Sequence, residues 1–477
     1  MTPIMVDLSH SQQRALAALA TVFPVAGELG RRFAAAGHEL YLVGGTVRDA
    51  LLGRRQSDLD FATSATPDQT KKALRGWAHH WDVGGERFGT VSAERDGWKL
   101  EITTFRADVY TPGSRHPEVT FGSDIEGDLA RRDFTMNAMA VRLPELRFVD
   151  PFGGLADLHA RVLRTPVDPK RSFGDDPLRM VRLARFAATL DARPEEHTLL
   201  AVSEMSGAID DISAERIRDE LSRLLVAPGQ ARGLDLLCET GLADHFLPEL
   251  PALRMEHDPL HHHKDVYSHT LAVIERCVPA DDLVVRMAAL LHDIGKPATR
   301  AFGPGGKVMF HHHESVGARM AERRLAALRY PQAFIRDVVA LIGLHLRFHG
   351  YGDDVWTDSA VRRYVHDAGS REQLARLNAL TRADVTTQNR AKAHRLAGAM
   401  NDLEARIARL EDEEELRATR PALDGRQIMA HLGLAPGPLV GQARQVLLDA
   451  RIERGPMSDG DAYALLDSWA AEHLPDH

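Results

Sequence analysis

The stretch that most constrains this chain is YLVGGTVRDALLGRRQSDLDFAT, residues 41–63. An apolar run leads to the pair Gly44-Gly45, and a second candidate strand carries Asp58 and Asp60. Residues i and i+2 of a strand point to the same face, so the two carboxylates converge. Such a pair is costly unless it shares a cation, and hard oxygen ligands suit Mg²⁺ held together with substrate phosphates.

The glycines and Arg48 supply the other half of this site. Glycine lets backbone N–H groups approach a phosphate, and Arg48 adds a forked donor. The stretch therefore predicts a metal-dependent site for a nucleoside triphosphate. Glu101 lies in a candidate strand, 98–105, that could lie beside the strand of Asp58 and Asp60. It is either a third carboxylate of the site or an ordinary surface residue.

Length and composition bound the class of protein. A chain of 477 residues predicts about three to four domains. The two cysteines, Cys238 and Cys277, give no disulfide framework and fit a reducing cytosol. We see no signal peptide and no run of about 18 apolar residues, so we expect a cytoplasmic protein without a membrane partner. The net charge of −9 argues against a basic coat but leaves room for a local basic groove.

Two further clusters follow along the chain. Arg131, Arg132 and Asp133 stand just before an apolar run, and Asn137 lies one turn beyond Asp133 in a segment, 124–141, that we expect to be helical in its middle. This set fits either phosphate and ribose contacts or an ion-paired helix start.

A helix is predicted to begin at Pro177, with Asp175 and Asp176 near its positive end. Arginines then recur every three residues along one stripe of this helix. They are Arg179, Arg182 and Arg185. A stripe of this kind is usually a solvated face, but its place directly after the phosphate-site domain favours a functional one.

Histidines concentrate between residues 257 and 390. The pattern runs from His269 to the doublet His292-Asp293, then to His313 and His345, and ends at Asp384. Mixed imidazole and carboxylate ligands can bind a divalent transition metal and activate water.

Together these motifs resemble the bacterial class II CCA-adding tRNA nucleotidyltransferase and poly(A) polymerase family, polymerase-β-like nucleotidyltransferases with an HD domain. The resemblance implies that Asp58 and Asp60 bind the catalytic Mg²⁺ ions and that Gly45 and Arg48 touch the triphosphate. It makes Arg132 the nucleotide contact of the segment Arg131–Asn137. The partners implied are tRNA, ATP and CTP.

In the family, an E-D-x-x-R motif reads the base. Asp176 and Arg179 match its reading pair, and Asp175 replaces the glutamate. An Asp accepts from an exocyclic amine and an Arg donates to ring acceptors, as C and A both require. In the HD region, His269, His292, Asp293 and Asp384 match the metal signature, with His313 and His345 as candidates for a second ion such as Ni²⁺, Mn²⁺ or Co²⁺. The alternative is an HD domain that has lost activity and serves as RNA-binding helices.

The expected fold is α+β, with a small mixed β-sheet head followed by a mostly helical neck, body and tail. We expect N-terminal helices, a nucleotidyltransferase head, a base-recognising neck, an HD domain and a helical tail. Their ranges are 1–37, 38–165, 166–255, 256–390 and 391–477. The oligomeric state stays open.

The leading hypothesis is CCA addition to tRNA. Poly(A) synthesis, or addition of A alone or CC alone, uses the same motifs and remains an alternative. A different class is an HD phosphohydrolase with a non-catalytic nucleotide-binding half. A non-catalytic RNA-binding protein fits less well, because an unneeded buried pair of carboxylates is destabilising.

Overall fold

The computed structural model forms two compact units, each considered by itself. One comprises Met1–Glu220 and Asp235–His245, and the other comprises Leu221–Leu234 and Phe246–His477. Besides residues 17 and 19, the described residues are 23–54, 58–81, 89–109, 118–121, 124–254, 265–304, 308–351, 356–385, 390–414 and 422–474. Most of the predicted N-terminal helical segment before residue 23 lies outside these ranges.

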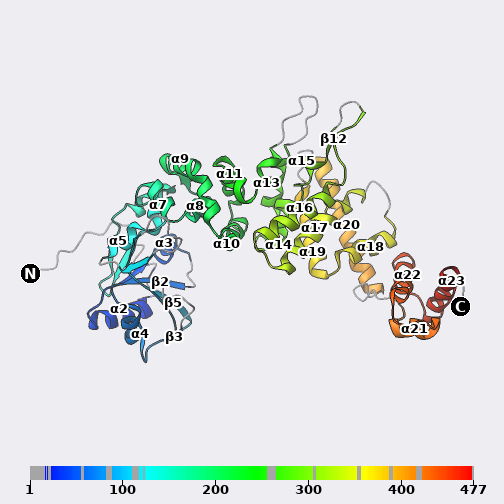
Figure 1. Cartoon of the computed structure of the whole chain (residues 1–477), viewed down its shortest axis with the longest axis horizontal. Helices are drawn as coiled ribbons and strands as arrows, with labels where there is room; N and C mark the ends of the chain where they lie inside the picture. The colour runs from blue at the N-terminus through cyan, green and yellow to red at the C-terminus, as the bar shows by residue number, and fades with distance from the viewer. Residues whose placement is uncertain are drawn as a thin grey trace, which may run out of the picture. The chain divides into compact units, whose positions relative to one another are not determined.

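The first unit is built on a seven-stranded mixed sheet, in the order β3-β4-β5-β2-β1-β8-β9 (Figure 1). In that order the strands are His79–Trp81, Thr90–Arg95, Trp98–Thr104, Asp58–Thr63, Leu40–Val43, Ala140–Leu143 and Arg147–Val149. Within this sheet β2 and β5 pair in parallel and the other neighbours pair antiparallel. The predicted small mixed sheet is confirmed, and so is the pairing of the 98–105 strand with the Asp58/Asp60 strand.

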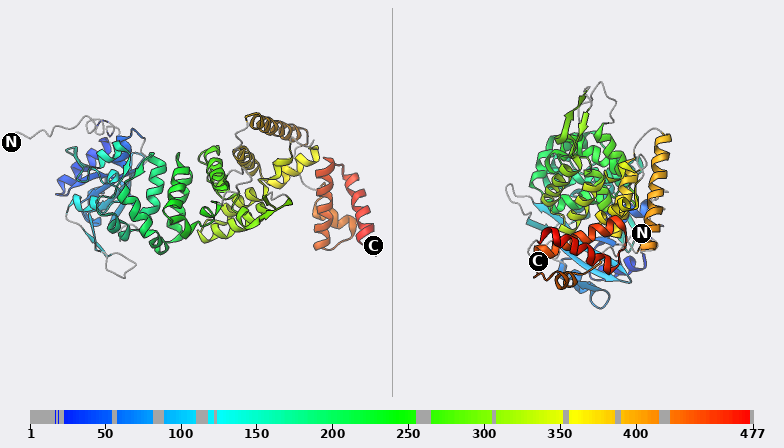
Figure 2. Two further views of the ribbon diagram at one scale, coloured as in Figure 1. Left: turned by 90° about the horizontal axis from the view of Figure 1, so that it is seen from above. Right: turned by 90° about the vertical axis from the view of Figure 1, so that its right-hand side faces the viewer.

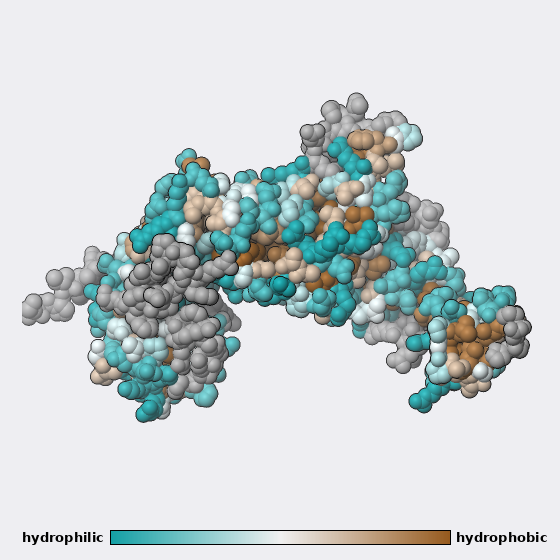
Figure 3. All heavy atoms as spheres, viewed as in Figure 1, coloured by the Kyte–Doolittle hydropathy of each residue, from teal (hydrophilic) through white to brown (hydrophobic). Residues whose placement is uncertain are grey.

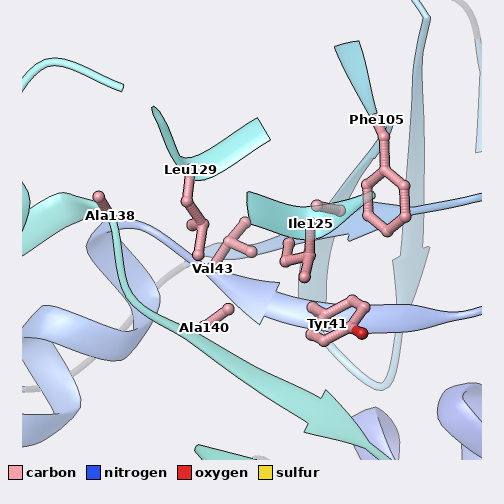
Figure 4. Packing of buried hydrophobic residues seen from close by; sticks show 8 residues of the cluster. Tyr41, Val43, Phe105, Ile125, Leu129, Ala138 and Ala140 are labelled. Carbon is pink, nitrogen blue, oxygen red and sulfur yellow. The ribbon is translucent and has the colours of Figure 1, made fainter. Parts of the chain in front are cut away.

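Helices cover this sheet and close its core. They are α2 (Phe23–Ala35), α3 (Gly45–Leu51), α4 (Pro67–Leu74) and α5 (Ile125–Ala130). The core on one face joins Tyr41 and Val43 of β1 to Ile125 and Leu129 of α5, with Phe105 beside them (Figure 4). This packing holds α5 against the strand that leads into the Gly44-Gly45 turn.

The segment 124–141 is less helical than its sequence predicts. After α5 it leaves helical geometry, forms a single 3₁₀ turn at Thr135–Asn137 and continues into β8. The carboxylate of Asp133 accepts the N–H of Phe134 at 2.8 Å. Such a local side-chain bond competes with the helical pattern, and Phe134 takes an extended conformation.

The described remainder of the first unit is mostly helical, with two small two-stranded sheets. It contains α6 (Gly154–Ala160), α7 (Pro169–Asp175), α8 (Leu178–Leu190) and α9 (Glu196–Met205). Three more helices, α10 (Ala214–Leu225), α11 (Gln230–Glu239) and α12 (Leu242–Phe246), contribute residues to both units. The predicted helix after Pro177 is confirmed.

The second unit is almost entirely helical. Its main helices are α13 (Val266–Arg276), α14 (Leu283–Leu291), α15 (Lys296–Thr299), α16 (His313–Ala327), α17 (Gln332–Leu344), α18 (Asp358–Ala368), α19 (Arg371–Asp384) and α20 (Arg390–Glu414). A two-stranded ribbon, β12 (Arg300–Phe302) and β13 (Val308–Phe310), lies between α15 and α16.

The last three helices share a core of their own. They are α21 (Gly425–Leu432), α22 (Pro438–Arg454) and α23 (Asp459–His473), which lie side by side in Figure 2. Ile428, Leu447 and Leu466 are fully buried among them. On the face drawn in Figure 3, apolar residues gather on this group of helices. No helix within the described ranges is both long and apolar enough to cross a bilayer.

Candidate functional sites

A cluster of three carboxylates lies at the centre of the sheet. The parallel register places Asp60 directly opposite Glu101, and Asp58 lies two residues before Asp60 on the same face. Burial, then the neighbouring charge of Glu101 and that of Asp58, raises the pKa of Asp60 to about 6, although Arg132 and Arg48 oppose the rise. Like charges on neighbouring positions of one sheet face are relieved by a shared cation, and carboxylate oxygens are the ligand type that a divalent metal such as Mg²⁺ prefers.

The glycine turn receives the guanidinium of Arg132. Gly44 has a φ of +64°, and a Cβ there would lie 2.6 Å from Nη1 of Arg132. Only glycine allows both the backbone conformation and this close approach. The Nε of Arg132 is buried and has no hydrogen-bond partner within the described part of the chain. Gly45 begins α3, and a Cβ there would lie 3.6 Å from Nη2 of Arg48.

Arg48 is already engaged in this structure. Its Nε and Nη2 donate to the two oxygens of Asp49 at 2.9 and 2.8 Å, and its Nη1 donates to Oδ1 of Asn137. The structure therefore brings together Arg48 and Asn137, which belong to two separate clusters of the sequence. Whether Arg48 also touches a triphosphate stays a prediction.

A buried ionic network joins Asn137 to the arginine stripe. Asp133 accepts hydrogen bonds from Nδ2 of Asn137 at 2.8 Å and from Nε of Arg182 at 2.9 Å. Arg182 and Arg185 of α8 both pair with Glu220 of α10. Arg182 and Arg185 are therefore largely covered and paired with acidic residues, so the stripe is not a solvated face.

The charge of Asp133 is held by this network. Burial alone would raise its pKa, but Arg182 and the hydrogen bonds from Asn137 and Phe134 outweigh burial and lower it to about 2. We expect Asp133→Asn to lower the free energy of unfolding at pH 7 by about 3 kcal/mol, because it removes one of the two carboxylates that pair with the partly buried Arg182.

The stabilising effect of Asp133 has a definite pH dependence. Because its folded-state pKa is depressed, the effect should be complete above about pH 4 and shrink as the pH falls toward 2. Urea denaturation of both proteins across this range would measure the difference. Asp211→Asn, at an exposed position, is the control and should change stability by less than about 0.5 kcal/mol. Equal effects of the two substitutions would contradict the assignment.

The two candidate base contacts lie at the start of α8. Arg179 is 8% exposed and donates to the carbonyl and hydroxyl oxygens of Ser172 at 3.1 and 2.8 Å, and to the carbonyl oxygen of Arg131. Asp176 accepts from Nη2 of Arg216 at 2.8 Å and from the N–H of Leu178. Arg179 and Asp176 are therefore positioned by separate sets of hydrogen bonds.

The second unit holds a compact cluster of potential metal ligands. Two groups, His269/His292/Asp293 and Asp293/His313/His345, each offer three ligand atoms within 4.8 Å of one another. Asp384 lies 2.9 Å from Nε2 of His269, and the Nζ of Lys296 lies 2.6 Å from Asp293. The structure thus brings together all six residues that the sequence pattern selected, around the shared Asp293.

Three of these histidines are oriented in the same way. The Nδ1 atoms of His292, His313 and His345 each donate to the carbonyl oxygen three residues earlier, at 2.7–2.8 Å. A carbonyl can only accept, so Nδ1 carries the hydrogen and Nε2 is turned toward the cluster. Burial, and the charge of His292, lower the pKa of His345 to about 4, so this ring is neutral at pH 7 and able to ligate. The donor set fits a transition metal.

Three protein families match successive parts of the chain. They are described as "Poly A polymerase head domain" over residues 40–164, "Probable RNA and SrmB- binding site of polymerase A" over 193–253, and "HD domain" over 266–416. An A-adding tRNA nucleotidyltransferase of Deinococcus radiodurans is 37% identical over 443 residues, which cover 90% of this chain and 95% of that protein. The chain belongs to the CCA-adding tRNA nucleotidyltransferase family.

Other members of this family match this chain along nearly its whole length. A CC-adding tRNA nucleotidyltransferase of Thermus thermophilus is 32% identical, covering 92% of this chain and 97% of its own. The crystal structure of the Bacillus stearothermophilus CCA-adding enzyme in complex with CTP superposes with a TM-score of 0.69 at 25% identity, covering 98% of this chain and all of that one. This tRNA nucleotidyltransferase is therefore an enzyme with the α+β fold of its family.

Sequence reasoning missed several residues of the nucleotidyltransferase unit. They are Asp128, Ser172, Arg216 and Glu220. Glu220 gave a readable signal, because it lies on the same helical face as Ile217, Leu221 and Leu224, which are all buried. A carboxylate on such a face requires a cationic partner. Asp128 also gave a local signal, because it lies three and four residues before Arg131 and Arg132, the spacing of helical ion pairs. Ser172 and Arg216 give no comparable pattern, since their partners Arg179 and Asp176 lie outside their own helices.

Proposed function

We propose that this nucleotidyltransferase extends the 3′ end of tRNA with C, C and A, taking the units from CTP and ATP and releasing pyrophosphate. The observation that carries the proposal is the carboxylate cluster of Asp58, Asp60 and Glu101, whose mutual repulsion calls for a cation, beside the guanidinium of Arg132. The 3′-hydroxyl oxygen of the RNA joins the α-phosphorus, and the bond to pyrophosphate breaks.

Asp58 and Asp60, with Glu101 beside them, would hold Mg²⁺ in this reaction. The bound ions would activate the hydroxyl and stabilise the charge of the leaving pyrophosphate. Arg132 presents its Nη1 toward the glycine turn, and its Nε has no hydrogen-bond partner among the described residues, so a triphosphate can accept hydrogen bonds from this guanidinium.

Base selection is assigned to the start of α8. Asp176 accepts from an exocyclic amine, and Arg179 donates to ring acceptors. C and A offer both groups, whereas G and U would leave buried polar groups unpaired, which is a strong basis for rejection. The partners of these two side chains, Arg216 and Ser172, are neighbours that a nucleotide would have to compete with or join.

The proposal is tested with tRNA that ends before CCA, incubated with CTP and ATP separately and together. Incorporation of two C followed by one A supports CCA addition, and failure to incorporate CTP overturns it. A-only addition is the second candidate, favoured by the similarity to the Deinococcus radiodurans protein over nearly its whole length. It would appear as AMP transfer to tRNA ending in CC. A long tail on unstructured RNA would indicate poly(A) synthesis.

A phosphohydrolase activity of the HD cluster is a further candidate, favoured by the three histidines whose Nε2 atoms face Asp293. We propose Ni²⁺, Mn²⁺ or Co²⁺ as its metal. We expect hydrolysis of 2′,3′-cyclic nucleotides with one of these ions, and its loss in Asp293→Ala, because Asp293 belongs to both ligand groups. Phosphate release and metal binding by calorimetry are the measurements.

The matched control for this prediction is His311→Gln. His311 is exposed and lies two residues before His313, outside both ligand groups. Its substitution should leave hydrolysis and metal binding unchanged. Metal binding that persists in Asp293→Ala, or hydrolysis equally lost in both variants, would contradict the assignment.

We place the enzyme in the cytoplasm with its tRNA substrate. Cys238 and Cys277 are both buried and keep their thiols out of any disulfide, as expected in a reducing compartment.

A further inference from the structure

The helix α5 carries a buried carboxylate that the reaction described above does not use. Figure 4 shows Ile125 and Leu129 of α5 directed at Val43 of β1. Asp128, next to Leu129, is 1% exposed. Because an unpaired carboxylate in the interior is very costly, partners must compensate its burial.

Both oxygens of Asp128 are taken by consecutive arginines. Oδ1 accepts from Nη2 of Arg131 at 2.9 Å, and Oδ2 accepts from Nη2 of Arg132 at 3.1 Å. Burial would raise the pKa of Asp128, but the two guanidiniums outweigh burial and lower it. One negative charge thus pairs with two positive ones.

The contact between Asp128 and Arg132 leads to the triphosphate side of the site. Asp128 binds one terminal nitrogen of Arg132, while Nη1 lies against Gly44 and Nε has no partner within the described residues. The charge of Arg132 is also close enough to Asp60 to lower its pKa. Asp128 therefore fixes one side of the Arg132 guanidinium.

The contact between Asp128 and Arg131 leads to the base side of the site. Arg131 is held by its side chain, and its carbonyl oxygen accepts a hydrogen bond from Nη2 of Arg179. The other terminal nitrogen of Arg179 binds Ser172. The position of the Arg131 main chain thereby helps to set the position of Arg179.

We propose that Asp128 is a positioning residue for nucleotide selection, because it fixes the triphosphate-facing Arg132 and the base-facing Arg179 relative to each other. The inference rests on the proposed function and adds the residue that couples the two ends of the bound nucleotide. Asp128 itself touches neither end. A buried ion pair with a purely structural role would stabilise the head without affecting selection.

The test compares Asp128→Asn with Asp124→Asn. Asp124 caps the same helix by accepting the N–H of Gly127, and asparagine caps equally well. We expect Asp128→Asn to raise the KM for ATP and CTP by about 10- to 100-fold, the loss typical of a charged hydrogen bond, with a smaller change in kcat. Misincorporation of GTP or UTP relative to ATP should rise several-fold, while the KM for tRNA stays constant. Asp124→Asn should match wild type.

Two further variants separate positioning from structure. Arg132→Gln should add much less to Asp128→Asn than it costs alone, since both act on one contact. Arg131→Gln keeps the main-chain carbonyl but removes one clamp, and should relax base selection even if Asp128→Asn folds poorly. Unchanged selection in Arg131→Gln, or additive effects in the double variant, would overturn the proposal. If wild type fails to extend tRNA, the proposed function fails, and ATP affinity measured by calorimetry still tests Asp128.

Discussion

Asp60→Asn is expected to reduce nucleotide incorporation into tRNA by about 1,000-fold or more. The substitution keeps the size of the side chain but removes the charge at the centre of the carboxylate cluster, and electrostatic stabilisation of a phosphoryl transition state is worth several kcal/mol. Single-turnover incorporation of labelled nucleotide at saturating Mg²⁺ is the measurement. Glu94→Gln, exposed on strand β4 of the same sheet, is the matched control and should retain activity.

The same substitution should have the opposite effect on stability without metal. The folded-state pKa of Asp60 is raised to about 6, so ionisation costs stability as the pH rises from about 4 through 6. In EDTA at pH 7, Asp60→Asn should therefore unfold at a higher temperature than wild type. Mg²⁺ should raise the unfolding temperature of wild type and leave that of the variant nearly unchanged. Full activity of the variant would refute the metal-site assignment.

Gly295→Ala is expected to disrupt the HD cluster although it replaces none of the candidate metal ligands. A Cβ at Gly295 would lie 2.2 Å from the carbonyl oxygen of His313 and 2.7 Å from the N–H nitrogen of Gly317. Because all these atoms are backbone, α15 and α16 must move apart, and His313 moves with α16. We expect a loss of about 2 kcal/mol in stability, as for other overpacked sites, and at least tenfold weaker metal binding. Thermal unfolding and calorimetry with Mn²⁺ or Ni²⁺ would measure both.

Gly343→Ala provides the control for this change. Gly343 lies inside α17, two residues before His345, and a Cβ there would meet no neighbouring atom of the described residues within 4 Å beyond its own helix backbone. Alanine there should stabilise the helix by about 0.5–1 kcal/mol and leave metal binding intact. Equal behaviour of the two alanine variants would show that the approach of α15 to α16 does not position His313.

The sequence predicted those parts of the site whose residues lie close together along one element. Asp58 and Asp60 on one strand, the arginines of α8 and the His292-Asp293 doublet follow from helical or strand periodicity. The pairing of Glu101 with Asp60 was open, because neighbouring strands are joined through a register that periodicity alone does not determine.

The contacts that hold these residues were harder to predict. Arg182 meets Asp133 and Glu220 over 49 and 38 positions of sequence. Arg48 meets Asn137 over 89. Such ion pairs and hydrogen bonds depend on how helices pack against the sheet, and local sequence patterns do not predict this packing. The shortened helix α5 has a local cause, the bond between Asp133 and the N–H of Phe134, that competes with helical propensity.

The orientation of the HD histidines bears on how ions exchange at that cluster. Because backbone carbonyls, and not a bound ion, decide which ring nitrogen carries the hydrogen, the rings of His292, His313 and His345 are aimed before any ion arrives. Metal binding therefore costs the histidine side chains little conformational entropy. Small domains that fold only around their zinc differ in this respect. A chelator should therefore empty the cluster while the surrounding helices remain folded, and a different ion could then be loaded into the same protein.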